Sequence, residues 1–153
     1  MAVEVGSEAP DFTLRDENGA EVSLSSLRGQ NVVLLFFPAA FSGICTKELH
    51  TATDLAEQYD AAGARVYGIS VDSPYALKAW KRDEELNAGF LSDNHPKGAV
   101  AETYGAYIPE AGVATRATYV IDKDGKVAHK MVNHPGEQRD QQAIIEALAA
   151  CPV

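Results

Sequence analysis

The sequence is poor in cysteine, in cationic residues and in long apolar runs, and each shortage excludes a class of protein. Two cysteines among 153 residues are too few for a scaffold built on several disulfides. Thirteen lysines and arginines stand against twenty-two aspartates and glutamates, and the formal net charge of −9 repels phosphate backbones and anionic lipid. Nucleic acid and membrane surfaces are therefore not expected partners.

Signs of export or of several domains are also missing. No segment offers the roughly 18 consecutive apolar residues of a membrane-spanning helix, and the amino terminus lacks the basic and apolar parts of a signal peptide. This predicts a cytoplasmic protein. Because there is no internal repeat, low-complexity tract or flexible linker, we expect a single domain over residues 1–153.

The apolar pattern predicts an α/β protein in which a helix connects parallel strands. Residues 31–37 are predicted to form a strand, and the uninterrupted apolar run over residues 32–37 is typical of one that is buried on both faces. Residues 46–62 have apolar side chains at helical spacing, and residues 65–71 form a second strand, so the three predict a right-handed crossover unit. Ser73 and Pro74 favour the start of another helix, which is expected to run to about residue 87.

Two hairpins and a last helix complete the predicted fold. Asn18-Gly19 predicts a turn between residues 12–14 and 21–24, and residues 122–125 connect a second hairpin. Residues 137–150 are expected to form a helix before Pro152. This order indicates a thioredoxin-like fold, with a central mixed β-sheet flanked by helices and an N-terminal β-hairpin extension.

Cys45 follows the first buried strand and lies in the expected first turn of a helix. A free cysteine has a pKa of roughly 8.5 and is mostly protonated near neutral pH, but a helix amino terminus and a nearby cation favour the thiolate. The unpaired amides of a first helical turn attract the sulfur and also an oxygen that reacts with it. An isolated cysteine among apolar residues is more often structural, so the surrounding residues decide between the two interpretations.

Pro38, Ser42 and Cys45 form the pattern Pro-x-x-x-Ser-x-x-Cys, which resembles the active-site motif of the peroxiredoxin family, where threonine is commoner than serine. Similar segments at residues 9–14, 68–74 and 116–122 extend the resemblance over most of the chain. Within the family, residues 37–45, 91–93 and 135–141 are similar to the AhpE-type, mainly one-cysteine branch of the AhpC/TSA-like proteins.

The resemblance implies a thiol-dependent peroxidase for hydrogen peroxide, alkyl hydroperoxides or peroxynitrite. Cys45 would attack the terminal peroxide oxygen and become a sulfenic acid, which an external thiol reduces. Ser42 and the Cys45 amide would hold the peroxide oxygens, Arg116 would supply positive charge, and Pro38 would shield the thiolate. We expect no cofactor and no metal, since the four histidines lack the spacing of a metal site.

Several residues keep a second interpretation. Ser42 is equally suited to a helix N-cap, and Arg116 to a surface charge. Glu48, three residues after Cys45, is expected either to orient the arginine or to lie on a solvated helix face, and Trp80 either to fill the core or to line the rim of the site. Cys151 remains the candidate for a resolving cysteine, within one chain or across subunits.

Competing functions lack support in the sequence. A thioredoxin-type disulfide reductase needs Cys-x-x-Cys, but Thr46, Lys47 and Glu48 follow Cys45. A redox sensor or holdase that passes its oxidation to another protein remains a third possibility. By resemblance we expect a homodimer, and a thiol reductant of the thioredoxin, mycoredoxin/mycothiol or glutaredoxin type.

Overall fold

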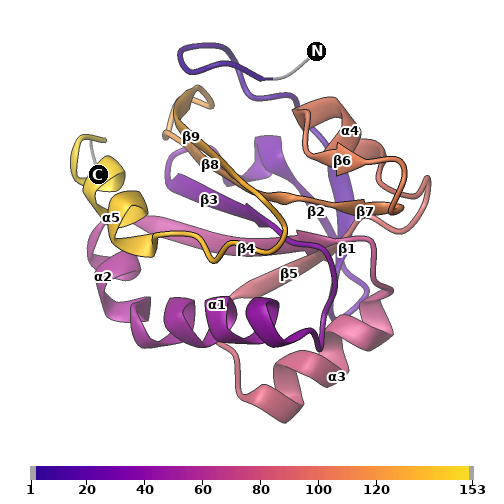
Figure 1. The fold of residues 1–153 in the computed structure, drawn as a ribbon. Helices are drawn as coiled ribbons and strands as arrows, with labels where there is room; N and C mark the ends of the chain where they lie inside the picture. Colours follow the sequence, from indigo (N-terminus) through magenta and orange to yellow (C-terminus); the bar gives the residue numbers. More distant parts are fainter. Residues whose placement is uncertain (1–2, 152–153) are drawn as a thin grey trace.

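A seven-stranded mixed sheet forms the centre of the computed structural model, which describes residues 3–151. The strands are β1 (Thr13–Asp16), β2 (Glu21–Ser23), β3 (Asn31–Phe36), β4 (Ala64–Ser70), β5 (Gly89–Ser92), β6 (Tyr107–Ile108), β7 (Val113–Ala114), β8 (Arg116–Ile121) and β9 (Val127–Asn133). The helices are α1 (Gly43–Asp54), α2 (Ala56–Ala61), α3 (Pro74–Glu84), α4 (Ala99–Tyr104), α5 (Gln141–Ala149) and the short 3-10 helix η1 (Leu24–Leu27). The sheet order is β2-β1-β5-β4-β3-β8-β9, and β6 pairs with β7 apart from it (Figure 1).

The centre of the sheet is parallel and its edges are antiparallel. β3 pairs in parallel with β4, and β4 with β5, whereas β8 lies antiparallel to β3 and continues into the hairpin with β9. The β1–β2 hairpin forms the other edge. This arrangement confirms the predicted thioredoxin-like α/β fold and its mixed sheet.

Helices cover both faces of the sheet. α1, α2, α3 and α5 lie on one face, while η1 and α4 contribute to the core on the other (Figure 1). In β3, Leu34 and Phe36 belong to the core on the face of η1 and α4, whereas Val33 and Leu35 belong to the core on the face of α1. Because successive strand residues point to opposite faces, both sets are buried, which explains the uninterrupted apolar run.

The predicted helix over residues 46–62 is wrong in its bounds. It begins at Gly43, and Leu55 separates α1 from α2. The hydroxyls of Thr51 and Thr53 donate to backbone carbonyls four residues earlier, at 3.1 and 2.8 Å. Such bonds by β-branched residues weaken and bend helices, which gives a physical reason for the interruption.

The helix expected from residue 137 begins instead at Gln141. Asp140 is its N-cap and accepts hydrogen bonds from the backbone amides of Gln142 and Ala143 at 3.0 and 3.3 Å. The backbone amide of Arg139 donates to the Glu48 side chain, so it is not available for a helix. Pro152, which was expected to follow this helix, lies outside the described residues. Within residues 3–151, no helix is long and apolar enough to cross a membrane.

Candidate active site

Cys45 occupies the first turn of α1. β3 ends at Phe36, residues 37–42 carry the chain away from the sheet, and Ser42 is the N-cap residue before Gly43. Cys45 is completely buried. The backbone amides of this first turn lack partners within the helix, so their partial positive charges lie near the sulfur.

The loop before α1 is fixed by Asp72, which follows β4. The Asp72 carboxylate accepts hydrogen bonds from the backbone amide of Ala40 at 2.8 Å and from the hydroxyl of Ser70 at 2.6 Å. Pro38 is half-buried in the same loop. The ends of β3 and β4 therefore determine the path of the chain toward Cys45.

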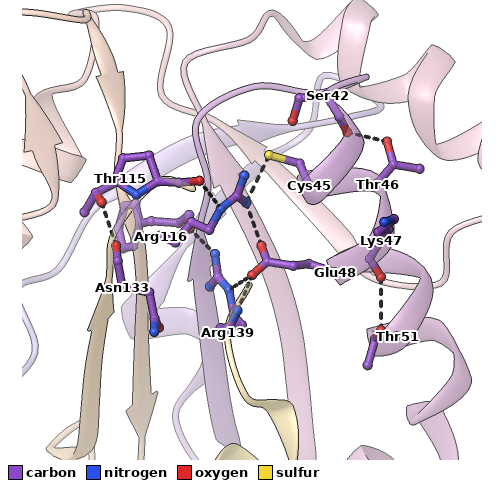
Figure 2. A network of polar contacts seen from close by, with 12 residues as sticks. Ser42, Cys45, Thr46, Lys47, Glu48, Thr51, Thr115, Arg116, Asn133 and Arg139 are labelled. Carbon is purple, nitrogen blue, oxygen red and sulfur yellow. Dashed lines mark hydrogen bonds and ion pairs between the residues drawn. The ribbon is translucent and has the colours of Figure 1, made fainter. Parts of the chain in front are cut away.

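Arg116 contacts the sulfur and is held in that place by two other acceptors. Its Nη1 lies 3.2 Å from Cys45 Sγ and 2.8 Å from Glu48 Oε1 (Figure 2). Its Nε donates to the Pro135 carbonyl at 2.7 Å. Arg116 begins β8 beside Ala117, which pairs with Phe36 at the end of β3. The antiparallel pairing of β8 with β3 thus brings the guanidinium to the loop that carries Cys45.

Glu48 is a buried carboxylate between two arginines. Its Oε1 accepts from Arg116, and its Oε2 accepts from the backbone amide and Nε of Arg139 at 2.8 and 3.0 Å (Figure 2). Arg139 also donates to the Ala117 carbonyl and to the Thr118 hydroxyl. Burial lowers the pKa of the Arg139 guanidinium from its ordinary value, and the Glu48 carboxylate opposes that change.

The charges of this buried cluster balance when the sulfur is a thiolate. Two guanidiniums face one carboxylate, so the cluster without a thiolate carries an excess positive charge. An uncompensated buried charge is costly, and a second anion beside Arg116 removes that cost. The arrangement therefore favours the anionic form of Cys45.

Ser42 and Trp80 contribute in different ways. The Ser42 hydroxyl oxygen is buried, makes no capping bond and has no hydrogen-bond partner within residues 3–151. The Trp80 ring is fully buried between Phe37 and Phe90, with ring centroids 5.3 Å apart in both pairs. Its Nε1 donates to the Thr46 hydroxyl at 3.3 Å, so Trp80 supports the first turn of α1 from the core.

Cys151 lies toward the opposite end of β8 from Cys45. Cys151 is buried at the end of α5, and burial, with a smaller effect of the Asp122 carboxylate, raises the pKa of its thiol. Asp122 follows β8, whereas Arg116 begins it beside Cys45. Six strand residues span about 20 Å, and a disulfide needs Cα atoms within about 7 Å.

The sequence analysis did not single out Arg139, Asp72 or Thr46. Arg139 lies in the segment 135–141 that resembles the AhpE-type branch, but the sequence predicts a helix there, which does not indicate a buried contact. No local pattern distinguishes a buried arginine with a distant carboxylate partner from an exposed one, because the contact joins residues 91 positions apart. Among residues 3–151, no group of three or more histidine, cysteine, aspartate or glutamate side chains is arranged to hold a metal ion.

Comparison with known proteins identifies the family. Residues 5–130 match the model of the AhpC/TSA family. Alkyl hydroperoxide reductase E of Mycobacterium tuberculosis is 42% identical over 147 residues, which are 95% of this chain and 96% of that protein. The crystal structure of the peroxidoxin BcpB from the same organism has a TM-score of 0.85 at 30% identity and covers 99% of both chains. Reduced 2-Cys peroxiredoxin of Plasmodium vivax has a TM-score of 0.87 at 26% identity, over 95% of this chain and 80% of that one. The chain therefore belongs to the AhpC/TSA family and is a peroxiredoxin, a thiol-dependent peroxidase.

Proposed function

We propose that the protein reduces hydrogen peroxide and alkyl hydroperoxides, with peroxynitrite as a further substrate, through a sulfenic acid on Cys45. The observation that carries this proposal is the contact of Arg116 Nη1 with both Cys45 Sγ, at 3.2 Å, and Glu48 Oε1, at 2.8 Å. A guanidinium in this place stabilises the thiolate before the reaction and the leaving oxygen during it.

The reaction transfers one oxygen atom to the sulfur. The Cys45 thiolate donates an electron pair to the terminal peroxide oxygen, the S–O bond forms, and the O–O bond breaks. With hydrogen peroxide or an alkyl hydroperoxide, the second oxygen leaves as hydroxide or alkoxide and takes up a proton to give water or an alcohol; with peroxynitrite, the leaving group is nitrite. Cysteine is oxidised to the sulfenic acid while the peroxide is reduced.

Ser42 and Pro38 complete the site around the peroxide. The buried Ser42 hydroxyl has its hydrogen-bonding capacity free among the described residues, so it is suited to donate to a peroxide oxygen. The amide of Cys45, in the first turn of α1, offers a second donor. Pro38 lies in the preceding loop without a backbone N–H and limits the access of water to the sulfur.

An external thiol completes the cycle in this proposal. The length of β8, which separates Arg116 beside Cys45 from Asp122 near Cys151, argues against an internal disulfide and leaves a reductant of the thioredoxin, mycoredoxin/mycothiol or glutaredoxin type. Such reductants keep thiols reduced in the cytoplasm, where we place the protein. An internal Cys45–Cys151 pair remains the alternative that the experiment below distinguishes.

Two exposed aromatic residues support a homodimer. Phe41 is 55% exposed and Tyr75 is 86% exposed. The bond from Ala40 to Asp72 connects the loop of Phe41 with the segment that leads to Tyr75 on α3. Large apolar groups beside one site are typical of an interface. Sedimentation should show twice the chain mass, and Tyr75→Asp should shift it toward the monomer.

Mass spectrometry after one equivalent of peroxide tests the function. We expect rapid consumption of the peroxide and a gain of one oxygen atom on Cys45, with no reaction in Cys45→Ser. Cys151→Ser should react at the wild-type rate. A Cys45–Cys151 crosslink would support internal resolution instead, and reduction of insulin without peroxide consumption would support a disulfide reductase.

A further inference from the structure

A buried chain of hydrogen bonds connects α2, α5 and α1 behind the active site. The Tyr59 hydroxyl on α2 donates to Gln141 Oε1 at 3.0 Å, and Gln141 Nε2 donates to the backbone carbonyl of Glu48 at 2.7 Å. Tyr59 is 1% exposed, Gln141 3% and Glu48 0%. All three therefore lie beneath the surface, out of reach of a substrate.

These polar groups are expensive to bury unless each has a partner. A buried hydroxyl or amide that loses its hydrogen-bond partner lowers the stability of the fold by about 1 to 3 kcal/mol. Apolar side chains of the same shape would fill the space without this penalty. Burial raises the pKa of Tyr59 well above its ordinary value, so its hydroxyl remains a neutral donor. The contacts orient the Gln141 amide, with its oxygen toward Tyr59 and its nitrogen toward Glu48.

The segment that opens α5 holds Glu48 at two points. Arg139 binds its carboxylate through the backbone amide and Nε, and Gln141, two residues later, binds its backbone carbonyl. Glu48 in turn accepts from Arg116 Nη1, which contacts Cys45 Sγ. A displacement of α1 relative to α5 therefore moves Glu48 Oε1 and turns the guanidinium relative to the sulfur.

We propose that Gln141, oriented by Tyr59, is a positioning residue for peroxide reduction. It sets the place of Glu48 and, through Glu48, the direction in which Arg116 approaches Cys45. This inference rests on the proposed function, since it requires that Cys45 react with peroxide. Its consequence is that reactivity depends on two buried side chains that touch neither the peroxide nor the sulfur.

Three single variants test the role of this chain of hydrogen bonds. Gln141→Met keeps the length of the side chain but removes both hydrogen bonds, and Tyr59→Phe removes one hydroxyl and keeps the ring. Tyr104→Phe is the matched control, because Tyr104 is equally buried and its hydroxyl donates to the Pro10 carbonyl at 2.6 Å in the core on the other face of the sheet. For each variant, denaturant unfolding and the pH profile of the second-order rate with hydrogen peroxide are measured.

The expected result separates positioning from stability. All three variants should unfold at lower denaturant concentration, but only Gln141→Met and Tyr59→Phe should react more slowly, Gln141→Met by about tenfold at neutral pH. Their rate profiles should shift to higher pH, since a misdirected guanidinium stabilises the thiolate less. A double variant that combines Gln141→Met and Tyr59→Phe should be no slower than Gln141→Met alone, because both changes break one chain of contacts.

Rates and pH profiles of Gln141→Met and Tyr59→Phe that equal those of Tyr104→Phe would overturn the positioning role. Tyr59→Phe keeps the proposal testable if Gln141→Met does not fold. A wild-type protein that fails to consume peroxide would contradict the proposed function itself, which is a distinct outcome.

Discussion

At the scale of single residues, the reactivity of the site depends on charges buried next to one another. Glu48 is fully buried, Arg116 and Arg139 are nearly so, and Cys45 Sγ completes the set. Buried charges are tolerated when each has a counter-charge with good hydrogen-bond geometry. The cluster therefore links the ionisation of the sulfur to the stability of the fold, and substitutions in it should affect both.

Arg116→Ala should slow the reaction with peroxide by a hundredfold or more. The loss of one donor to a developing oxyanion costs roughly 2.7 to 4 kcal/mol of transition-state stabilisation. Stopped-flow kinetics with hydrogen peroxide measures the second-order rate, and circular dichroism checks that the variant is folded. A folded variant with an unchanged rate would show that Arg116 has no part in the chemistry.

Glu48→Gln should reduce the free energy of unfolding by about 3 kcal/mol, because it leaves two buried guanidiniums without their carboxylate. Arg139→Met in the same chain should recover part of this loss by removing one uncompensated charge. Urea unfolding of the single and double variants measures the effect. A double variant that is less stable than Glu48→Gln would contradict the idea that charge balance is what stabilises the cluster.

The residues of the site differ in how far the sequence reveals them. Pro38, Ser42 and Cys45 stand within eight positions of one another, so a local pattern identifies them as candidates. Arg139 and Gln141 act through contacts with residues 91 and 93 positions away. Their burial depends on where α5 begins, which is set by the Asp140 cap together with the distant contact of Arg139 with Glu48.

At the scale of elements, the apolar pattern of the sequence was sufficient to predict the strands at the centre of the sheet. It was insufficient to predict where helices begin and end. β3 and β4 were predicted because their apolar runs satisfy both faces of the sheet. β5, with four residues, was missed because so short a run has no periodicity to recognise. The start of α5 was misplaced because the Asp140 cap and the tertiary contact of Arg139 override helix propensity over residues 137–140.

Asp140→Ala and Ser73→Ala compare the caps of two helices. Asp140 caps α5, and the Ser73 hydroxyl caps α3 by accepting from the Ala76 amide at 3.2 Å. Each substitution should cost about 1 kcal/mol of unfolding free energy. Only Asp140→Ala should also slow peroxide reduction severalfold, since Asp140 stands between Arg139 and Gln141. Equal rates in the two variants would contradict a link between the start of α5 and the site.

At the scale of the whole molecule, one sheet separates two hydrophobic cores. The two cores differ in the partners of their buried polar groups. The core under α1 and α5 contains the active-site sulfur and the Tyr59 hydroxyl. The other core contains Tyr104 and Tyr119, whose hydroxyls donate to backbone carbonyls. Tyrosine ionisation therefore reports on both cores at once.

Alkaline unfolding should follow from these buried tyrosines. Burial raises the pKa of Tyr119 to about 12 and also raises the pKa values of Tyr59, Tyr67 and Tyr104. Because the folded-state pKa values exceed the unfolded value of about 10, their stabilisation is complete below that pH and is lost as the pH rises toward the folded-state values. Tyrosinate absorbance from the four buried tyrosines, Tyr59, Tyr67, Tyr104 and Tyr119, should rise together with the loss of circular dichroism. Ionisation of the buried tyrosines in a protein that keeps its circular dichroism would contradict the two-core description.

The most direct test of the account is the ultraviolet absorbance of the Cys45 thiolate at neutral pH, measured in Cys151→Ser, where Cys45 is the one remaining cysteine, and again after Arg116→Ala is added. The two buried guanidiniums around Glu48 predict a thiolate signal that is weaker without Arg116. Equal absorbance with and without Arg116, or no thiolate signal in Cys151→Ser, would contradict the account.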